Sequence, residues 1–138
     1  MSVEFTDNSV KVKAALNDAA IAYLYEAAGE MEAQVKRNQT RVGTGQTKNA
    51  WTYTVDESKG EAVVGNPLEN SIWEEFGTGE HALHGDGRKG GWVYKDDKGD
   101  WHFTMGKEPI RPLFNAFTTL KSKLIRRAEQ VLKERMGD

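Results

Sequence analysis

The sequence contains no cysteine and only three prolines among its 138 residues. Without cysteine there is no disulfide framework, thiol nucleophile or thiolate metal site. No apolar run approaches the roughly 20 residues that a membrane-spanning helix needs, so we expect no membrane association. Residues 1–7 lack a basic segment followed by an apolar one, so we expect no signal peptide and synthesis in the cytosol.

The net charge is also small, −2 at neutral pH, but it is unevenly distributed along the chain. Residues 1–110 carry 12 Lys or Arg against 18 Asp or Glu, a balance of −6, whereas residues 111–138 carry 7 against 3, a balance of +4. Opposite fields of this kind favour head-to-tail contact between copies of a chain. A basic helix that simply faces solvent is the other explanation.

Two long helical patterns enclose a middle segment rich in glycine and aromatic residues. Apolar residues at spacings of three and four predict a first helix that ends at about Arg37 and a last helix that begins near Pro112. The expected packing face of the first helix consists of Val12, Leu16, Ala20, Leu24, Ala27, Met31 and Val35. That of the last helix consists of Leu113, Phe117, Leu120, Leu124, Ala128 and Val131.

Two β-hairpins are expected between the helices, from residues 51–65 and 92–105. Alternating apolar and polar residues predict their strands, and Gly99 suits a turn that needs a positive φ. In the second hairpin, Trp92 and Tyr94 share one face of one strand, and residues including Trp101 and Phe103 share one face of the other. With a short helix at 68–76, the sequence predicts one α+β domain over residues 1–138, with two long helices packed on a small antiparallel sheet of hairpins.

Two segments carry residue types found in phosphate and metal sites, but their context argues against both. Residues 43–48 partly resemble a phosphate-binding loop, yet Asn49 follows the lysine and a strand pattern comes next, so we expect a flexible helix-to-strand connection. His81, His84 and Asp86 are possible metal ligands, but they lie in a glycine-rich loop with no obvious catalytic base. We expect no metal site and no cofactor.

Catalysis and nucleic-acid binding have weak support. Glu74 and Glu75 are adjacent, so on a helix they point about 100° apart and do not converge on one substrate atom. We therefore predict that the protein is not an enzyme. The basic last helix makes a nucleic-acid-binding accessory protein the alternative function, although the acidic balance of the whole chain argues against direct binding.

The order of four short motifs resembles a known family. A long helix to about Arg37 is followed by Thr44-Gly45 before the first strand at Ala50-Trp51. Glu75-Phe76-Gly77-Thr78 comes next, and Pro112 then opens the last helix. This pattern is similar to the head–tail joining, or neck, family of long-tailed siphophages and related prophages, whose members are also described as minor capsid or tail-completion proteins.

The resemblance implies a structural role in the phage particle. The protein would form a homo-oligomeric ring between the portal–adaptor assembly and the tail, with other neck and tail proteins as partners. It would be present in the host cytoplasm during assembly and then in the neck or tail of the virion, and it could be monomeric when free. The glycine-rich loop and hairpin at about residues 79–108 are an insertion relative to a minimal member.

Specific residues of these motifs have expected places. We expect Trp73 and Phe76 in the core, Gly77 as the glycine that ends a short helix, and Glu75 facing a partner. The loop after Gly77 is expected to meet neighbouring proteins. The aromatic hairpin of Trp92, Tyr94, Trp101 and Phe103 is expected to contact other subunits.

Overall fold

The structure is a computed structural model that describes residues 9–41 and 45–135. Its elements follow the chain as α1 (Ser9–Asn38), α2 (Gln46–Asn49), β1 (Thr52–Asp56), β2 (Glu61–Gly65), α3 (Asn70–Phe76), the 3-10 helix η1 (Gly79–His81), β3 (Trp92–Lys95), β4 (Trp101–Thr104) and α4 (Pro112–Arg135). The α+β class and both long helices are confirmed. The two hairpins form two separate two-stranded antiparallel sheets.

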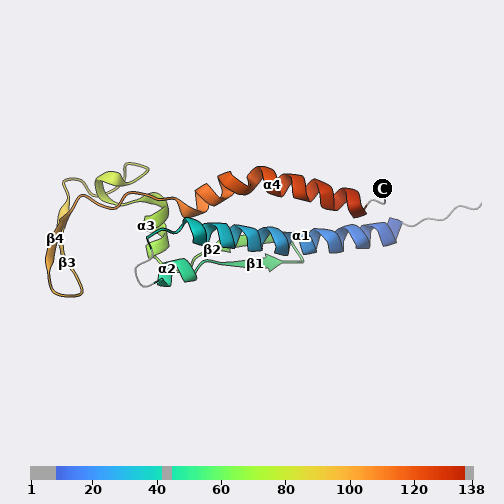
Figure 1. The fold of residues 1–138 in the computed structure, drawn as a ribbon, viewed down its shortest axis with the longest axis horizontal. Helices are drawn as coiled ribbons and strands as arrows, with labels where there is room; N and C mark the ends of the chain where they lie inside the picture. Colours follow the sequence, from blue (N-terminus) through green and yellow to red (C-terminus); the bar gives the residue numbers. More distant parts are fainter. Residues whose placement is uncertain (1–8, 42–44, 136–138) are drawn as a thin grey trace, which may run out of the picture.

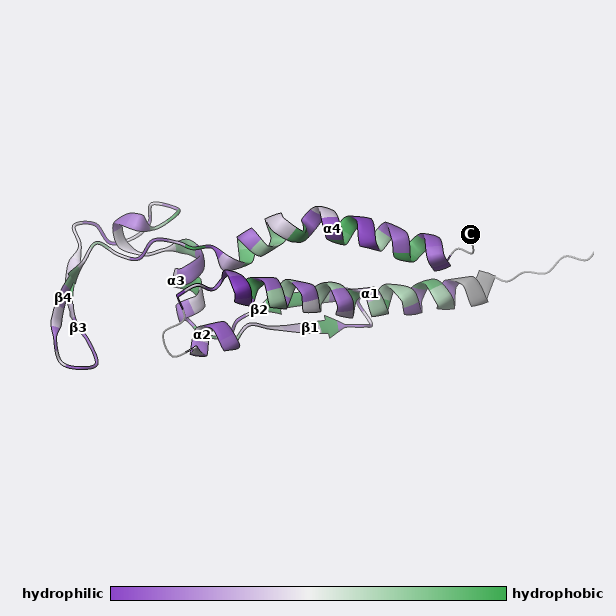
Figure 2. Cartoon of the chain, viewed as in Figure 1, coloured by the Kyte–Doolittle hydropathy of each residue, from purple (hydrophilic) through white to green (hydrophobic). Residues whose placement is uncertain are grey.

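Helix α1 is the element around which the others pack. Figure 1 shows α4 along one side of α1 and the β1–β2 hairpin along another, and both pairs of elements are in contact. Apolar and polar residues alternate along both helices in Figure 2, as expected for helices with one buried face. None of the helices within the described ranges is long and apolar enough to cross a membrane.

The buried core is small and lies at the C-terminal end of α1. Val35, Trp51 and Ala116 form it, and partly buried Met31, Val64 and Leu113 pack against them. The indole N–H of Trp51 donates to Oε1 of Gln39 at 3.2 Å, whereas Nε2 of Gln39 is buried without a hydrogen-bond partner among the described residues. The core therefore joins α1 and α4 to the start of the first hairpin.

The predicted packing faces of the two long helices are partly wrong. Ala19 and Ala28 are buried on α1, whereas Ala20, predicted on the packing face, is exposed. On α4, Ala116 and Leu120 are buried, but Phe117 is half exposed. The side chain of Val12 lies outside the described residues. Both helices thus bury fewer positions than predicted, and these positions lie slightly to one side of the predicted packing face. Few other elements are available to cover a wider face.

The first hairpin packs one of its faces on α1. Its register pairs Tyr53 with Val64 and Val55 with Ala62, which places these four residues on the same face. All four are half-buried, while Val63 on the other face is exposed. The turn at residues 57–60 and both strands agree with the sequence-based prediction.

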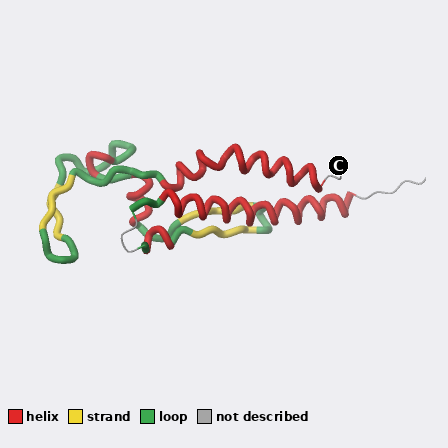
Figure 3. The backbone as a smooth tube through the Cα atoms, in the orientation of Figure 1, coloured by secondary structure: helices red, strands yellow, loops and turns green. Residues whose placement is uncertain are grey.

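The second hairpin projects from the end of the molecule beyond α3. We call residues 82–104 the arm and the two segments that lead to it, residues 77–81 and 105–109, the stem. Figure 3 shows that most of this part is loop, with the β3–β4 pair at its far end. The turn uses Gly99 at φ 89°, as predicted.

Candidate functional site

Glu75, expected to face a partner, is instead buried within its own chain. Its side chain is 8% exposed, and its two carboxylate oxygens accept hydrogen bonds from the backbone N–H groups of Leu113 at 3.0 Å and Phe114 at 2.8 Å. These are the second and third residues of α4, whose N–H groups have no partner inside the helix. Glu75 therefore caps the helix that Pro112 opens, and its negative charge suits the positive end of the helix dipole.

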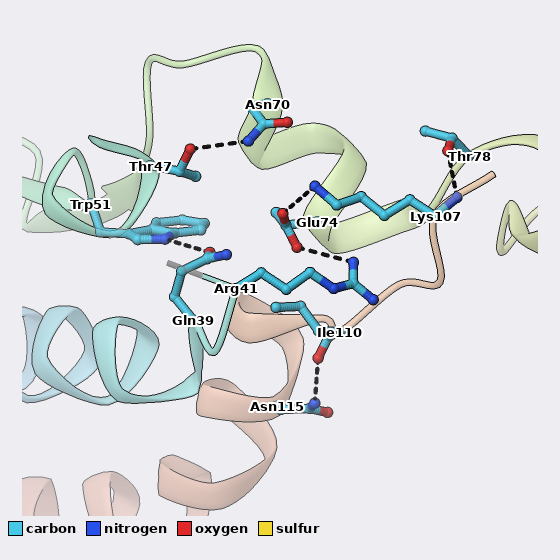
Figure 4. A network of polar contacts seen from close by, with 10 residues as sticks. All are labelled: Gln39, Arg41, Thr47, Trp51, Asn70, Glu74, Thr78, Lys107, Ile110 and Asn115. Atoms are coloured by element: carbon cyan, nitrogen blue, oxygen red, sulfur yellow. Dashed lines mark hydrogen bonds and ion pairs between the residues drawn. The ribbon is translucent and has the colours of Figure 1, made fainter. Parts of the chain in front are cut away.

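Glu74 is buried even more deeply and joins three segments of the chain. Its side chain is 1% exposed, and it forms ion pairs with Arg41 at 3.2 Å and with Lys107. Its backbone carbonyl accepts from the N–H groups of Ile110 at 2.9 Å and Arg111 at 3.1 Å. Figure 4 shows Arg41 and Lys107 converging on Glu74 from opposite sides. A buried carboxylate needs such partners because unpaired burial of charge is costly.

Burial of both glutamates turns the apolar residues of α3 outward. Trp73 and Phe76, predicted as core, are each 41% exposed, and Ile72 is also exposed. The prediction that they form a buried corner is wrong. The seven-residue helix has one face occupied by Glu74 and Glu75, so its large apolar side chains point to the other.

Gly77 and Thr78 hold the base of the stem. Gly77 ends α3 at φ 74°, and a Cβ there would approach the Lys107 carbonyl oxygen to 2.9 Å. The N–H of Thr78 donates to that same carbonyl at 2.9 Å, and the N–H of Lys107 donates to the Thr78 hydroxyl at 2.8 Å. The predicted glycine at the helix end is thus confirmed, and the motif Glu75–Thr78 both caps α4 and closes the stem.

An open apolar groove lies between α1, β2, the end of α3 and the first half of α4. It has a volume of about 610 Å³. We define the groove by its lining residues Ala27, Ala28, Met31, Ala62, Val64, Glu75, Phe76, Arg111, Leu113, Phe114, Phe117 and Leu124. Phe76, Phe114 and Phe117 are all well exposed within it. The groove exists because α4 and β2 both pack on α1 and leave the space between them unfilled.

Among the described residues, Arg111 is the single cation that lines the groove. Its guanidinium carbon lies 3.8 Å from the centre of the Phe114 ring, and its Nε has no hydrogen-bond partner among the described residues. Its φ of 52° is left-handed, which is uncommon for a residue with a side chain. Two backbone hydrogen bonds stabilise this conformation: the Arg111 N–H donates to the Glu74 carbonyl, and the Asn115 N–H donates to the Arg111 carbonyl.

The aromatic residues of the arm lie on two opposite faces. The register pairs Tyr94 with His102 and Val93 with Phe103, so the face of Trp92 and Tyr94 is opposite to the face of Trp101 and Phe103. Trp101 is 68% and Phe103 65% exposed. Trp92 is half-buried, with the Arg88 guanidinium over its ring at 5.6 Å.

The Thr-Gly connection is described only in part, because Thr44 lies outside the described residues. Gly45 is buried, with φ 82°, at the start of the short helix α2. Thr47 in α2 is buried and accepts two hydrogen bonds. Its carbonyl oxygen accepts from the side-chain amide of Asn66 at 2.8 Å, and its hydroxyl oxygen accepts from the side-chain amide of Asn70 at 3.1 Å. The prediction of a flexible connection is therefore wrong for Gln46–Asn49, which form a short helix held by hydrogen bonds to Asn66 and Asn70.

The candidate metal ligands do not come together. His84 stacks against Phe76 with ring centres 5.5 Å apart, and His81 Nδ1 lies 4.0 Å from a carboxylate oxygen of Glu108. No group of three potential metal ligands occurs among the described residues. As predicted, most of this segment is loop, apart from the single turn of η1.

The basic helix α4 uses part of its charge within the molecule. Arg127 pairs with Glu26 at 3.2 Å and Lys123 pairs with Glu30 at 3.1 Å, both across to α1. Between them, the Tyr23 hydroxyl donates to the Leu124 carbonyl at 2.6 Å. Burial raises the pKa of Tyr23, and the nearby carboxylates of Glu26 and Glu30 raise it further. Two of the six cations of α4 thus pair with carboxylates of α1, which leaves fewer of them for the nucleic-acid alternative.

Three of the charged residues that organise this region were not predicted from the sequence. Arg41 and Lys107 are each separated from Glu74 by 33 positions, and Arg111, whose N–H donates to the Glu74 carbonyl, lies 37 positions beyond it. A local pattern carries no signal for such distant pairs. Only the position of Arg111 directly before Pro112, at a helix start, was visible in the sequence.

Comparison of the chain with protein-family models, with curated proteins and with solved structures gave no match.

Proposed function

We propose that this protein is a structural component of the head–tail junction of a tailed bacteriophage, where it forms a ring between the portal–adaptor assembly and the tail. The observation that carries the proposal is the capping of α4 by Glu75. It joins two motifs of the family resemblance, Glu75–Thr78 and the proline-led helix, into one structural unit. The motifs would otherwise be short matches scattered along the chain.

The distribution of apolar surface also supports an assembly role. Large apolar side chains are exposed on α3, on the arm and on the first half of α4, including Trp73, Phe117, Trp101 and Phe103. Exposed apolar groups gathered in this way mark surfaces that other proteins cover. The partners in this proposal are further copies of the chain and the neighbouring neck and tail proteins.

The experiment is to disrupt the gene in the phage or prophage that carries it and to inspect the lysate by electron microscopy. We expect DNA-filled heads and tails that remain separate, a loss of infectious particles, and recovery of both when the wild-type protein is supplied in trans. The protein is also expected in purified virions or in head–tail assembly intermediates. Normal joined particles from the disrupted gene, with the protein absent from virions and intermediates, would overturn the proposal.

A further inference from the structure

Two apolar surfaces of this chain are left uncovered by the residues that the structure describes. One is the groove, with the rings of Phe76, Phe114 and Phe117 exposed in it. The other is the face of the arm formed by Val93, Lys95, Trp101 and Phe103, which we call the outer face. Its three apolar side chains are all more than half exposed, and the Lys95 ammonium lies over the Trp101 ring at 5.9 Å.

The outer face needs a partner for its own stability. An isolated two-stranded hairpin is marginal in water, and its edges present unpaired backbone groups. Among the described elements, β3 and β4 pack closely only with each other. An aromatic hairpin of this kind is held in one conformation when another surface covers it.

The β3–β4 hairpin of the same molecule does not supply the groove with an occupant, although His84 of the arm contacts the groove residue Phe76. Figure 1 places β3 and β4 beyond α3, at the end of the molecule, whereas the groove lies between α1, β2 and α4. The direction of the arm is fixed by the stem, where a Cβ at Gly79 would meet the Met105 carbonyl oxygen at 2.4 Å. The two surfaces can meet only between different copies.

Charge supports the same pairing. Two charged residues line the groove in the described part of the chain, Glu75 and Arg111. The carboxylate of Glu75 is occupied by the N–H groups at the start of α4, whereas Nε of Arg111 has no hydrogen-bond partner among the described residues. The turn next to the outer face carries three carboxylates, Asp96, Asp97 and Asp100, against Lys95 and Lys98. Asp96 is used within the turn, while Asp97 and Asp100 are exposed beside Trp101. An apolar hairpin face with an acidic edge thus matches an apolar groove with a basic edge.

We propose that the outer face of the arm of one copy docks in the groove of the next copy. The contact is head-to-tail, because each copy gives its arm to one neighbour and its groove to the other, and contacts of this type close into rings when the rotation between copies allows it. The inference rests on the proposed function for its place in the phage, but the contact itself is a property of the purified protein.

The test uses the absence of natural cysteine. One variant carries Phe103→Cys on the outer face and a second carries Phe117→Cys in the groove; the two are mixed at high concentration and oxidised. We expect the mixed disulfide to form about tenfold faster than in two control mixtures, because docking raises the effective concentration of the two thiols. The controls pair F103C with Thr119→Cys, an exposed position on α4 that does not line the groove, and F117C with Tyr94→Cys, on the opposite face of the arm.

A third variant checks that apolar docking brings the thiols together. Trp101→Ala, added to F103C, is expected to reduce the rate of the mixed disulfide to that of the controls, with an unchanged circular dichroism spectrum because Trp101 is largely exposed. Equal rates in all mixtures, or a dominant F103C–F103C product, would overturn the inference. The two proposals can fail separately. If the F103C–F117C disulfide forms preferentially but the gene is dispensable for head–tail joining, the phage role is contradicted and the contact between copies is still supported.

Discussion

At the scale of single residues, Glu74 and Glu75 decide the geometry of the whole central region. They are neighbours in sequence and point in different directions on a helix, as their spacing requires. One direction leads to Arg41 and Lys107 and the other to the start of α4. Two adjacent carboxylates that look unsuited to catalysis are thus well placed to fasten three separate segments together.

Replacing Glu75 by alanine tests the cap. We expect Glu75→Ala to lower the free energy of unfolding by about 1–2 kcal/mol, because it removes the acceptor for two N–H groups at the start of α4. Glu75→Gln, which keeps one carbonyl oxygen, should lose less. Urea unfolding measures both, and Glu129→Ala on the exposed side of α4 is the control. Equal stability of E75A and E129A would contradict the cap.

A pair of glycine variants tests the close approach of the two stem segments. Gly106 has φ 115°, and a Cβ there would lie 2.0 Å from the Thr78 carbonyl oxygen; Gly85 has φ 70° and open space around it. Each change to alanine costs about 1–2 kcal/mol of left-handed strain, but only Gly106→Ala adds a backbone clash. We expect faster hydrogen exchange at the amides of Thr78 and Glu80 in G106A alone. The same exchange rates in G85A would show that the clash is unimportant.

At the scale of elements, the parts that follow local patterns were predictable. The long helices and both hairpins came from periodicity and turn residues, and Pro112 marks the start of α4. The exposure of Trp73 and Phe76 was not predictable, because the inward side of α3 is chosen by ion pairs with residues 33 positions away in each direction. The groove was not predictable for the same reason: it is a space between four elements, α1, β2, α3 and α4, and the pattern of no single element indicates it.

The turn of the arm has a built-in acid sensitivity. The hydrogen bond from His102 lowers the pKa of Asp96, and the N–H groups of Asp100, Lys98 and Gly99 lower it further. A lowered pKa means that the Asp96 carboxylate binds a proton less readily in the folded turn than in the unfolded chain. The stabilisation is therefore present above the ordinary pKa of aspartate and is lost as the pH falls through the lowered value.

We expect the Lys98 and Asp100 amides of the arm to lose protection from hydrogen exchange in this acidic range. Asp96→Asn should weaken their protection at neutral pH and remove most of the pH dependence, since asparagine does not ionise. Asp97→Asn is the matched control, because the exposed Asp97 accepts no hydrogen bond among those described. Nuclear magnetic resonance across a pH series follows both amides. Equal protection in D96N and wild type at neutral pH would contradict the role of Asp96.

At the scale of the whole molecule, the chain divides into a packed part and a projecting part. The packed part contains α1, β1, β2, α3 and α4, and its core lies far from the arm. The contacts of Glu74 and Glu75 join segments of the packed part to one another and to the stem, and none of those given above involves the arm. The projecting arm thus contributes surface to the molecule and little to its core.

Removing the arm tests this division. Replacing residues 82–104 by a short Gly-Ser linker, with the stem retained, should change the midpoint of thermal unfolding by less than about 5 °C, because little buried apolar area is lost. Circular dichroism at a helix-sensitive wavelength measures it. A Gly-Ser replacement of segment 45–50, which contains buried Thr47 and its hydrogen bonds to Asn66 and Asn70, is the comparison and should unfold at a much lower temperature. A large drop on removing the arm would show that it belongs to the core.

The closed stem also has a consequence for how this chain can change over evolution. The Glu74 and Lys107 pair, with the Thr78 backbone bonds, fixes the two ends of the loop from residue 77 to residue 109 a short distance apart. Once the ends are fixed, doubling the length of a flexible loop costs only about 0.6 kcal/mol of closure entropy. Insertions, deletions or exchanged sequence between the two stem segments are therefore cheap, and partner specificity can diverge there while the helices that carry the fold stay the same.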